Sequence, residues 1–161
     1  MEIEMTIKGL IPDPITSMPI VVLRDGEGKR LLPIWVGVFE GNAIMLQIEN
    51  VQTPRPMTHD LLKNVIQDLD GMVERIVVCD LRDNTFYATI HIRIGERIVA
   101  IDARPSDAIN LALRTGSRIF VEESVIDSAR SIETGKESMD VVRLQKWLEG
   151  LSEDELGKYK M

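Results

Sequence analysis

This sequence of 161 residues contains a single cysteine, and that shortage excludes several kinds of protein. With Cys79 alone, neither an intramolecular disulfide nor a zinc site built from several cysteines can form. Cys79 follows the apolar residues Ile76, Val77 and Val78. We therefore predict that Cys79 is a small buried side chain.

The sequence also lacks a long apolar run. No stretch approaches the ~20 residues that a membrane-spanning helix needs. The first residues, Met1-Glu2-Ile3-Glu4, are acidic, whereas a signal peptide begins with basic residues and continues with an apolar stretch. Apolar residues still make up 44% of the chain, enough for the core of one compact domain. We expect a cytoplasmic protein that has no membrane partner.

Positive charge is in deficit, because 19 Lys and Arg residues face 26 Asp and Glu residues and the net charge is −7. A protein that binds nucleic acid by bulk electrostatics is usually basic. Any phosphate-bearing partner must therefore be held by a local cluster of arginines. The sequence also lacks a glycine-rich phosphate loop and a Gly-x-Ser-x-Gly nucleophile turn.

The spacing of apolar residues predicts an α+β domain over residues 1–130. Its mixed or antiparallel strands form two halves, each with a hairpin and a buried helix. Strand patterns cover residues 2–7, 19–24, 30–36, 74–81, 85–94, 97–103 and 119–121, and helical spacing covers residues 39–49, 58–69 and 105–114. Pro12 and Pro14 are expected to end the first strand, and Thr58 to be the N-cap of the second helix. Residues 131–161 are predicted to be a polar linker and a charged C-terminal tail, with a short amphipathic helix at 141–151.

The two halves of the domain look alike. Each runs strand, hairpin, strand and helix, and residues 42–46 (Asn-Ala-Ile-Met-Leu) echo residues 107–111 (Asp-Ala-Ile-Asn-Leu). The echo indicates either an internal duplication or common core chemistry. Apolar residues on more than one side of the helix at 39–49 predict that it is well buried. The helix at 58–69 carries one apolar stripe.

The first segment with candidate chemistry is Asp102-Ala103-Arg104-Pro105-Ser106-Asp107. Proline suits the first turn of a helix, whose free N–H groups and positive dipole end favour a phosphate or carboxylate. Arg104 would add a bidentate donor for the same anion, and Asp102 ends a strand where a cleft is common. Alternatively, Ser106 and Asp107 simply cap their own helix while Arg104 pairs with Asp102.

A second segment, Arg55-Pro56-Met57-Thr58-His59-Asp60, repeats this arrangement. His59 lies in an exposed first helical turn, where it could act as a general base, a metal ligand or a phosphate donor. A lone surface histidine usually has no such role, but Arg55, Asp60 and the first segment strengthen the case for one without excluding an ordinary surface histidine. The other histidine, His91, lies within a strand and is expected to have a surface or packing role.

Glu40 opens the first helix and corresponds, through the internal echo, to the helix start at Pro105. It is either a stabiliser of its own helix or a third acid in the cleft. The spacing of His59, Asp60, Asp102 and Asp107 matches no motif specific for a metal. A divalent cation such as Mg²⁺ or Mn²⁺ held by carboxylates is chemically compatible with them.

Four segments carry a resemblance to a known family: residues 32–37, 40–44, 55–61 and 102–109. They resemble the bifunctional nuclease domain family, formerly described as a domain of unknown function. The match covers about residues 1–127, and residues 142–159 resemble the C-terminal extension of prokaryotic members. The resemblance implies an α+β domain that self-associates, and a nuclease activity attributed to plant members on DNA and RNA.

The first hypothesis is therefore a nuclease-like phosphodiester hydrolase acting on DNA or RNA. The expected catalytic residues are His59, Asp60, Asp102, Asp107 and Glu40, and the expected phosphate-binding residues are Arg55, Thr58, Arg104 and Ser106. The acids would orient water or a divalent cation. A second hypothesis is a module that binds an anion or nucleotide without turnover. A third is an oligomeric scaffold. In each case we expect a homo-oligomer, with a dimer favoured.

Overall fold

The computed structural model describes residues 1–129 and 132–133, and these contain one mixed sheet of eight strands with four helices. The strands are β1 (Glu2–Pro12), β2 (Pro19–Asp25), β3 (Arg30–Trp35), β4 (Gly71–Arg82), β5 (Thr85–Ile94), β6 (Arg97–Ala103), β7 (Arg118–Glu122) and β8 (Ile132–Glu133). The helices are α1 (Val38–Ile48), α2 (Thr58–Asp68), α3 (Pro105–Thr115) and α4 (Glu123–Ser128). The α+β prediction is confirmed. The predicted tail helix at 141–151 lies outside the described residues.

The sheet contains two antiparallel three-stranded units, one on either side of β7, and the short strand β8 is added to β3 at one edge. Its strand order is β6-β5-β4-β7-β1-β2-β3-β8. Strand β7 runs antiparallel to β1 and parallel to β4, which makes the sheet mixed. The first unit leads into α1 and the second into α3, so the predicted order of strand, hairpin, strand and helix is present in both halves.

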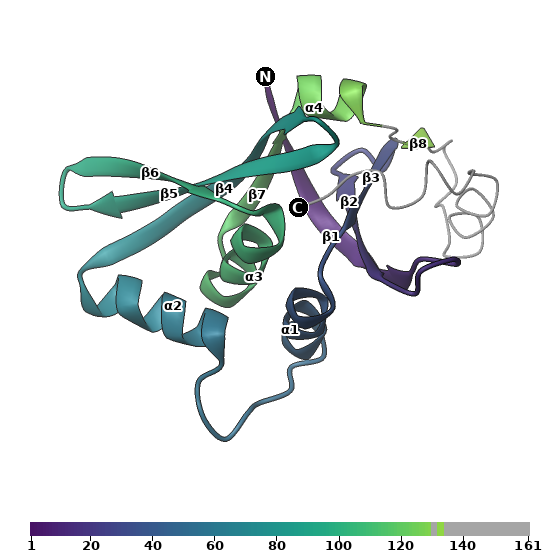
Figure 1. Ribbon diagram of the computed structural model, residues 1–161. Coiled ribbons are helices and arrows are strands. Elements are labelled where there is room, and N and C mark those ends of the chain that lie inside the picture. The colour runs from purple at the N-terminus through teal and green to yellow at the C-terminus, as the bar shows by residue number, and fades with distance from the viewer. Residues whose placement is uncertain (130–131, 134–161) are drawn as a thin grey trace.

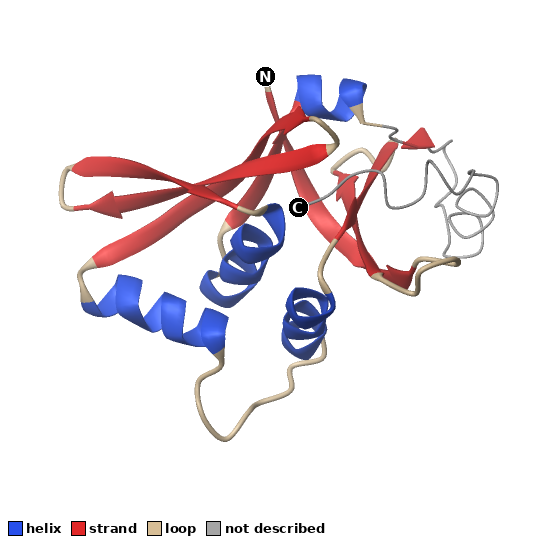
Figure 2. Cartoon of the chain, viewed as in Figure 1, coloured by secondary structure: helices blue, strands red, loops and turns tan. Residues whose placement is uncertain are grey.

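Three helices lie close together and a fourth lies apart from them (Figure 1). Helix α3 packs against both α1 and α2, and also against β4, β5 and β7. Helix α4 contacts β4 and β7 near the other end of these strands. The β5–β6 hairpin extends beyond the helices at one edge of the sheet (Figure 2). The start of α3 is thus held between the sheet and the two other helices.

The core follows from the periodicity of the strands. In β5 the even-numbered residues from Phe86 to Ile92 are buried and the odd-numbered ones are half-buried, as expected for a strand with one face on a core. In α3, seven residues are buried, because its apolar side faces the sheet while α1 and α2 flank it. Helix α1 differs from the prediction. Only Gly41 and Ile44 are buried there, and Phe39 is 87% exposed.

A close approach fixes α1 on the sheet at Gly41. A Cβ atom at this position would lie 2.5 Å from Cγ of Pro19 and 3.2 Å from Cγ2 of Val36. Two non-bonded carbon atoms cannot lie this close together, so a Cβ atom at position 41 would have to displace Pro19 or Val36. Gly41 therefore lets the first turn of α1 lie directly on the start of β2.

Three local predictions are wrong. Strand β1 continues through Pro12, which pairs with Pro19 at the end of the ladder, where a missing N–H group matters least. The N-cap of α2 is Met57, and Thr58 is the first helical residue. Cys79 is only partly buried, because a register shift between Val78 and Asp80 interrupts the alternation of β4.

A buried carboxylate that the sequence did not reveal stabilises the loop after β1. Asp13 is 1% exposed and accepts hydrogen bonds from the backbone N–H of Ile15 and from Nε1 of Trp35, each at 2.8 Å. Burial alone would raise the pKa of the Asp13 carboxyl, but these N–H groups outweigh it and hold the pKa below its usual value. Asp13 therefore has a structural role.

Candidate active site

The first turns of three helices converge beside one pocket. Glu40 lies in the first turn of α1, His59 in that of α2 and Asp107 in that of α3. A helix N-terminus offers unpaired N–H groups and the positive end of the helix dipole. Three such ends at one place favour an anion in the space between them.

A histidine–aspartate pair joins two of these helices. Nε2 of His59 lies 2.8 Å from Oδ1 of Asp107, which is a short hydrogen bond. The sequence predicted an exposed position for His59, but its side chain is only 10% exposed, because Asp107 of α3 lies against it. The Asp107 side chain is 30% exposed. In the tautomer whose Nε2–H donates a hydrogen bond to the carboxylate, Asp107 fixes the orientation of the ring and the lone pair is on Nδ1. This arrangement is the one by which a carboxylate orients a general base.

Arg104 extends this pair to the third helix. Its Nε donates to Oδ2 of Asp107 at 2.9 Å, and its Nη2 donates to Oε1 of Glu40 at 2.8 Å. Arg104 is the N-cap residue of α3, so the backbone itself positions the guanidinium between the two acids. Half of the Arg104 side chain stays exposed, and no hydrogen bond of Nη1 is recorded among the described residues. Nη1 is therefore available to an anion in the pocket.

The charges of this network stabilise one another. The hydrogen bond from His59 lowers the pKa of the Asp107 carboxyl, and Arg104 lowers it further, against the opposing effect of burial. The hydrogen bond to Asp107 raises the pKa of Arg104. At neutral pH, Asp107 is therefore ionised and Arg104 is positively charged, as binding a phosphate beside a general base requires.

The network lines a pocket of about 330 Å³. Its walls come from one side of α1 and from the starts of α2 and α3. The lining residues are Phe39, Glu40, Asn42, Ala43, Leu46, Met57, Thr58, His59, Arg104 and Asp107. We call this space the dyad pocket, after His59 and Asp107.

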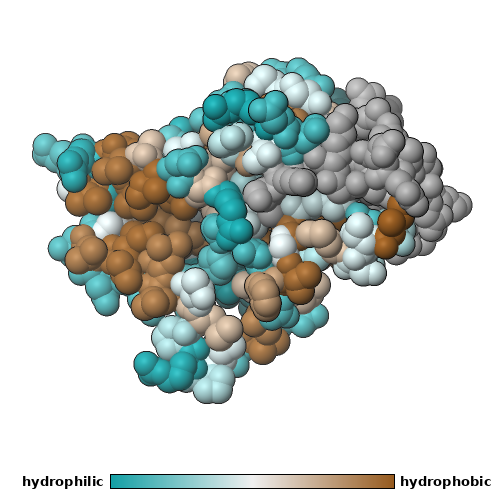
Figure 3. Space-filling model, in the orientation of Figure 1, coloured by the Kyte–Doolittle hydropathy of each residue, from teal (hydrophilic) through white to brown (hydrophobic). Residues whose placement is uncertain are grey.

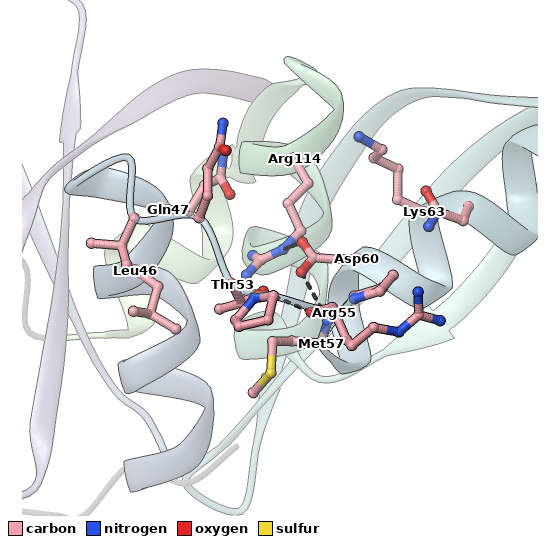
Figure 4. A pocket seen from close by; sticks show the side chains of 13 residues that line it. Leu46, Gln47, Thr53, Arg55, Met57, Asp60, Lys63 and Arg114 are labelled. Atoms are coloured by element: carbon pink, nitrogen blue, oxygen red, sulfur yellow. Dashed lines mark hydrogen bonds and ion pairs between the residues drawn. The ribbon is translucent and has the colours of Figure 1, made fainter.

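A second pocket of about 410 Å³ adjoins the first and shares Leu46 and Met57 with it. We call it the basic pocket, because Arg55, Lys63 and Arg114 line it together with a single acid, Asp60 (Figure 4). Among the described residues, neither Arg55 nor Lys63 makes an ion pair. The two pockets thus form one continuous surface between α1 and α2.

Comparison with known proteins shows the family of this chain. The model of the bifunctional nuclease domain matches residues 21–134. The chain belongs to the bifunctional nuclease domain family. An uncharacterized protein of Mycobacterium tuberculosis is 36% identical over 160 residues, which cover 98% of this chain and 90% of that protein. Bifunctional nuclease 1 of Arabidopsis thaliana is 33% identical over 135 residues, which cover 80% of this chain and 41% of the plant protein.

The rice relative gives the same pattern. Bifunctional nuclease 2 of Oryza sativa subsp. japonica is 32% identical over 124 residues, which cover 73% of this chain and 38% of the rice protein. The chain therefore spans less than half the length of these plant relatives. What it shares with them is the bifunctional nuclease domain, and the family resemblance expected from the sequence is confirmed.

Within this bifunctional nuclease domain, the expected site residues fall into separate places. Glu40, Thr58, His59, Arg104 and Asp107 all line the dyad pocket. Asp60 and Arg55 line the basic pocket, where Arg55 extends away from the pair of Asp60 and Arg114 (Figure 4).

Two expected residues do not join either group. Asp102 is exposed on the edge strand β6, opposite Thr89 of β5. Ser106 is fully buried, and its Oγ has no hydrogen-bond partner. Neither side chain lines the two pockets. The alternative that Arg104 pairs with Asp102 is wrong, since its partners are Asp107 and Glu40.

Sequence reasoning missed Arg114, which joins all three helices. Its Nε donates to Oδ1 of Asp60 at 2.7 Å, its Nη1 to the carbonyl of Asn110 at 3.1 Å, and its Nη2 to the carbonyl of Ala43 at 3.2 Å. Its side chain is only 4% exposed. The available signal was its spacing, because Asn110 and Arg114 lie one helical turn apart on the side of α3 that carries buried residues.

The geometry does not assign a metal site. No three His, Cys, Asp or Glu side chains of residues 1–129 and 132–133 gather closely enough to hold an ion. Both carboxylates of the dyad pocket are instead bound to Arg104. In the same part of the chain, no helix has the length and apolar character that crossing a membrane requires.

Proposed function

We propose that this domain hydrolyses phosphodiester bonds of DNA or RNA in the dyad pocket. The observation that carries the proposal is the chain of contacts from His59 through Asp107 and Arg104 to Glu40, at the meeting point of three helix N-termini. The family membership supports the same activity. Arg104 and the helix ends would bind the phosphate and stabilise the negative charge that develops on it.

The dyad would supply the proton transfer. His59 would accept a proton from the attacking water as its oxygen bonds to phosphorus, and the bond to the leaving oxygen then breaks. The same proton, returned from His59, would neutralise the leaving group. Asp107 would hold the imidazole in place and stabilise its protonated form during the step. Glu40 would position Arg104 from its far side.

Strand cleavage by purified protein tests this assignment. Labelled single-stranded DNA and RNA are incubated with the wild type, with His59→Gln and with His91→Gln, each in Mg²⁺, Mn²⁺ or EDTA. Loss of a general base is expected to slow cleavage by about 10²- to 10⁴-fold in His59→Gln. His91→Gln is the matched control, because it removes a half-buried histidine of β5 that lines neither pocket. Equal cleavage rates for the wild type and His59→Gln would refute the assignment of His59 as the general base.

A second comparison addresses Arg104. Arg104→Met keeps the length of the side chain but removes its charge, so cleavage should fall roughly 10²-fold or more, as when one donor to a developing negative charge is lost. Arg97→Met removes an exposed arginine from the edge strand β6 and serves as the control. If both variants lose activity equally, the effect is one of overall charge and Arg104 has no specific role.

One observation favours binding without turnover as the second candidate. His59 is 8% exposed, and both nearby carboxylates are already neutralised by Arg104, so a bound anion could rest there unchanged. Thermal unfolding with added inorganic phosphate and mononucleotides tests this. A stabilisation that Arg104→Met abolishes, without cleavage of any strand by the wild type, would establish the binding function.

We also propose that two copies of the domain associate through α2. The apolar stripe predicted for this helix is largely exposed to solvent, since Leu61, Val65 and Leu69 are 46–71% exposed. Ile94 and Ile101 of the β5–β6 hairpin are 37% and 43% exposed, and Figure 3 shows a large apolar area on the side of the molecule where this hairpin and α2 lie. We call it the α2 surface. Exposed apolar side chains gathered on one face favour a protein–protein contact there.

A further inference from the structure

One aromatic side chain stands out on the surface of this domain. Phe39 is 87% exposed, and no other aromatic residue of the described part of the chain is fully exposed. An exposed apolar residue by itself carries no functional meaning. The position of Phe39 gives it one, because it lines the dyad pocket together with Arg104, Asp107 and His59.

Helix α1 sets the distance between the phenyl ring and the phosphate-binding group. Phe39 directly precedes Glu40, and Glu40 holds the Arg104 guanidinium at 2.8 Å. A ring that is largely exposed while it still lines a pocket lies at its rim. The flat apolar face of Phe39 therefore lies at the rim of the pocket whose one arginine, Arg104, can bind a phosphate.

The surface on the other side of the dyad pocket suits a sugar–phosphate backbone. The basic pocket begins at Met57 and Leu46, which both pockets share, and contains Arg55 and Lys63 without ion-pair partners among the described residues. The dyad pocket thus contains an aromatic ring and an arginine, and the adjoining basic pocket contains two further cations. Proteins that bind single strands combine these two elements: aromatic faces for the bases and positive groups for the backbone.

A duplex cannot use such a ring, because its base faces are already stacked on one another inside the helix. Only an unpaired or extruded base offers a free face. Stacking also needs no net positive charge, which agrees with a chain whose net charge is −7. We propose that Phe39 is a base-stacking platform at the rim of the dyad pocket, and that the substrate of this site is therefore unpaired nucleic acid. This inference rests on the proposed function and specifies its substrate class.

Binding to strands with and without bases tests the proposal. Fluorescence anisotropy measures the affinity for a labelled oligothymidylate and for an abasic strand of the same length, both in the His59→Gln background so that neither strand is consumed. Phe39→Ala should weaken binding to oligothymidylate by roughly five- to a hundredfold, and should leave binding to the abasic strand unchanged. Phe39→Trp should retain the affinity and show quenched fluorescence at position 39 when the strand binds.

Val38→Ala is the matched control. Val38 is 61% exposed in the same helical turn but lines a different pocket. This variant should leave both affinities unchanged, and thermal unfolding should show that both variants remain folded.

Several results would overturn the inference. Equal weakening on both strands by Phe39→Ala would mean that the ring does not contact bases. Binding of a blunt duplex as tightly as a single strand, or no binding of any strand, would also refute it. Sedimentation that differs between Phe39→Ala and the wild type without nucleic acid would assign the ring to a subunit contact instead. If Phe39→Ala weakens binding only to the strand with bases, and the wild type cleaves no strand, then Phe39 is a stacking platform and only the proposed hydrolytic function is refuted.

Discussion

Arg114 provides the sharpest test of how the site is assembled. We consider the substitution Arg114→Met, which keeps an unbranched side chain of similar length but removes every hydrogen bond. The guanidinium contacts the carboxylate of Asp60 and the backbone carbonyls of Asn110 and Ala43, and so ties α2, α3 and α1 together. Without it, these three acceptors lose a charged partner at a place where water has little access.

The size of the effect follows from the burial of the two charges. Breaking a buried ion pair by removing one partner costs about 3–5 kcal/mol. The Arg114 side chain is 4% exposed, but that of Asp60 is 32% exposed, so water partly replaces the lost partner. Asp60 also keeps the backbone N–H of Met57, at 3.0 Å. We therefore expect Arg114→Met to lower the free energy of unfolding by about 2–4 kcal/mol.

Urea unfolding followed by circular dichroism measures this loss. The control is Arg118→Met, because Arg118 pairs with Glu4 at an exposed site, where water screens the two charges and the loss of the pair should have little effect. A double-mutant cycle that combines Arg114→Met with Asp60→Asn measures the interaction between the two side chains. It should give a coupling free energy of about 0.5–3 kcal/mol. If Arg114→Met costs no more than Arg118→Met, or the coupling is absent, then Arg114 does not hold the three helices together.

Three further predictions follow from the fold. Because the pKa of Asp13 is lower in the folded than in the unfolded protein, its ionised form stabilises the fold above the unfolded-state pKa of about 3.9. This contribution is lost as the pH falls through the folded-state pKa. In urea unfolding, Asp13→Asn should therefore destabilise the protein at pH 7 and have a smaller effect at pH 3. Gly41→Ala should lower the free energy of unfolding by about 1–3 kcal/mol because its Cβ meets Pro19, and a gain in stability, as at an ordinary helical glycine, would contradict the close approach. Leu69→Glu places a charge on the α2 surface and should convert a dimer to a monomer in sedimentation. Gln67→Glu adds the same charge at another exposed position of α2 and should leave the dimer intact. A monomeric wild type would refute the proposed role of the α2 surface.

Local sequence patterns predicted most elements of the fold, but not the short elements α4 and β8. Alternation of apolar residues predicted β5 and β6 within the bounds that the structure has, and Pro105 marked the first turn of α3. These features depend on neighbours along the chain, because side-chain period and the fixed φ of proline are local properties. The same patterns correctly indicated that both Arg-Pro segments lead into helices, and thereby which residues belong to helix starts.

Only the tertiary structure decided which of these residues act together. His59 and Asp107 are 48 residues apart in the sequence, and Arg104 and Glu40 are 64 residues apart, yet each pair shares a hydrogen bond of 2.8 Å. No local rule predicts such contacts, because they depend on how α1 and α2 pack against α3. Packing also buried Ser106 and left Asp102 on an exposed edge strand, although both have the same sequence neighbourhood as Arg104. The sequence thus determined that the helices begin where a phosphate could be bound, and their packing determined which side chains meet there.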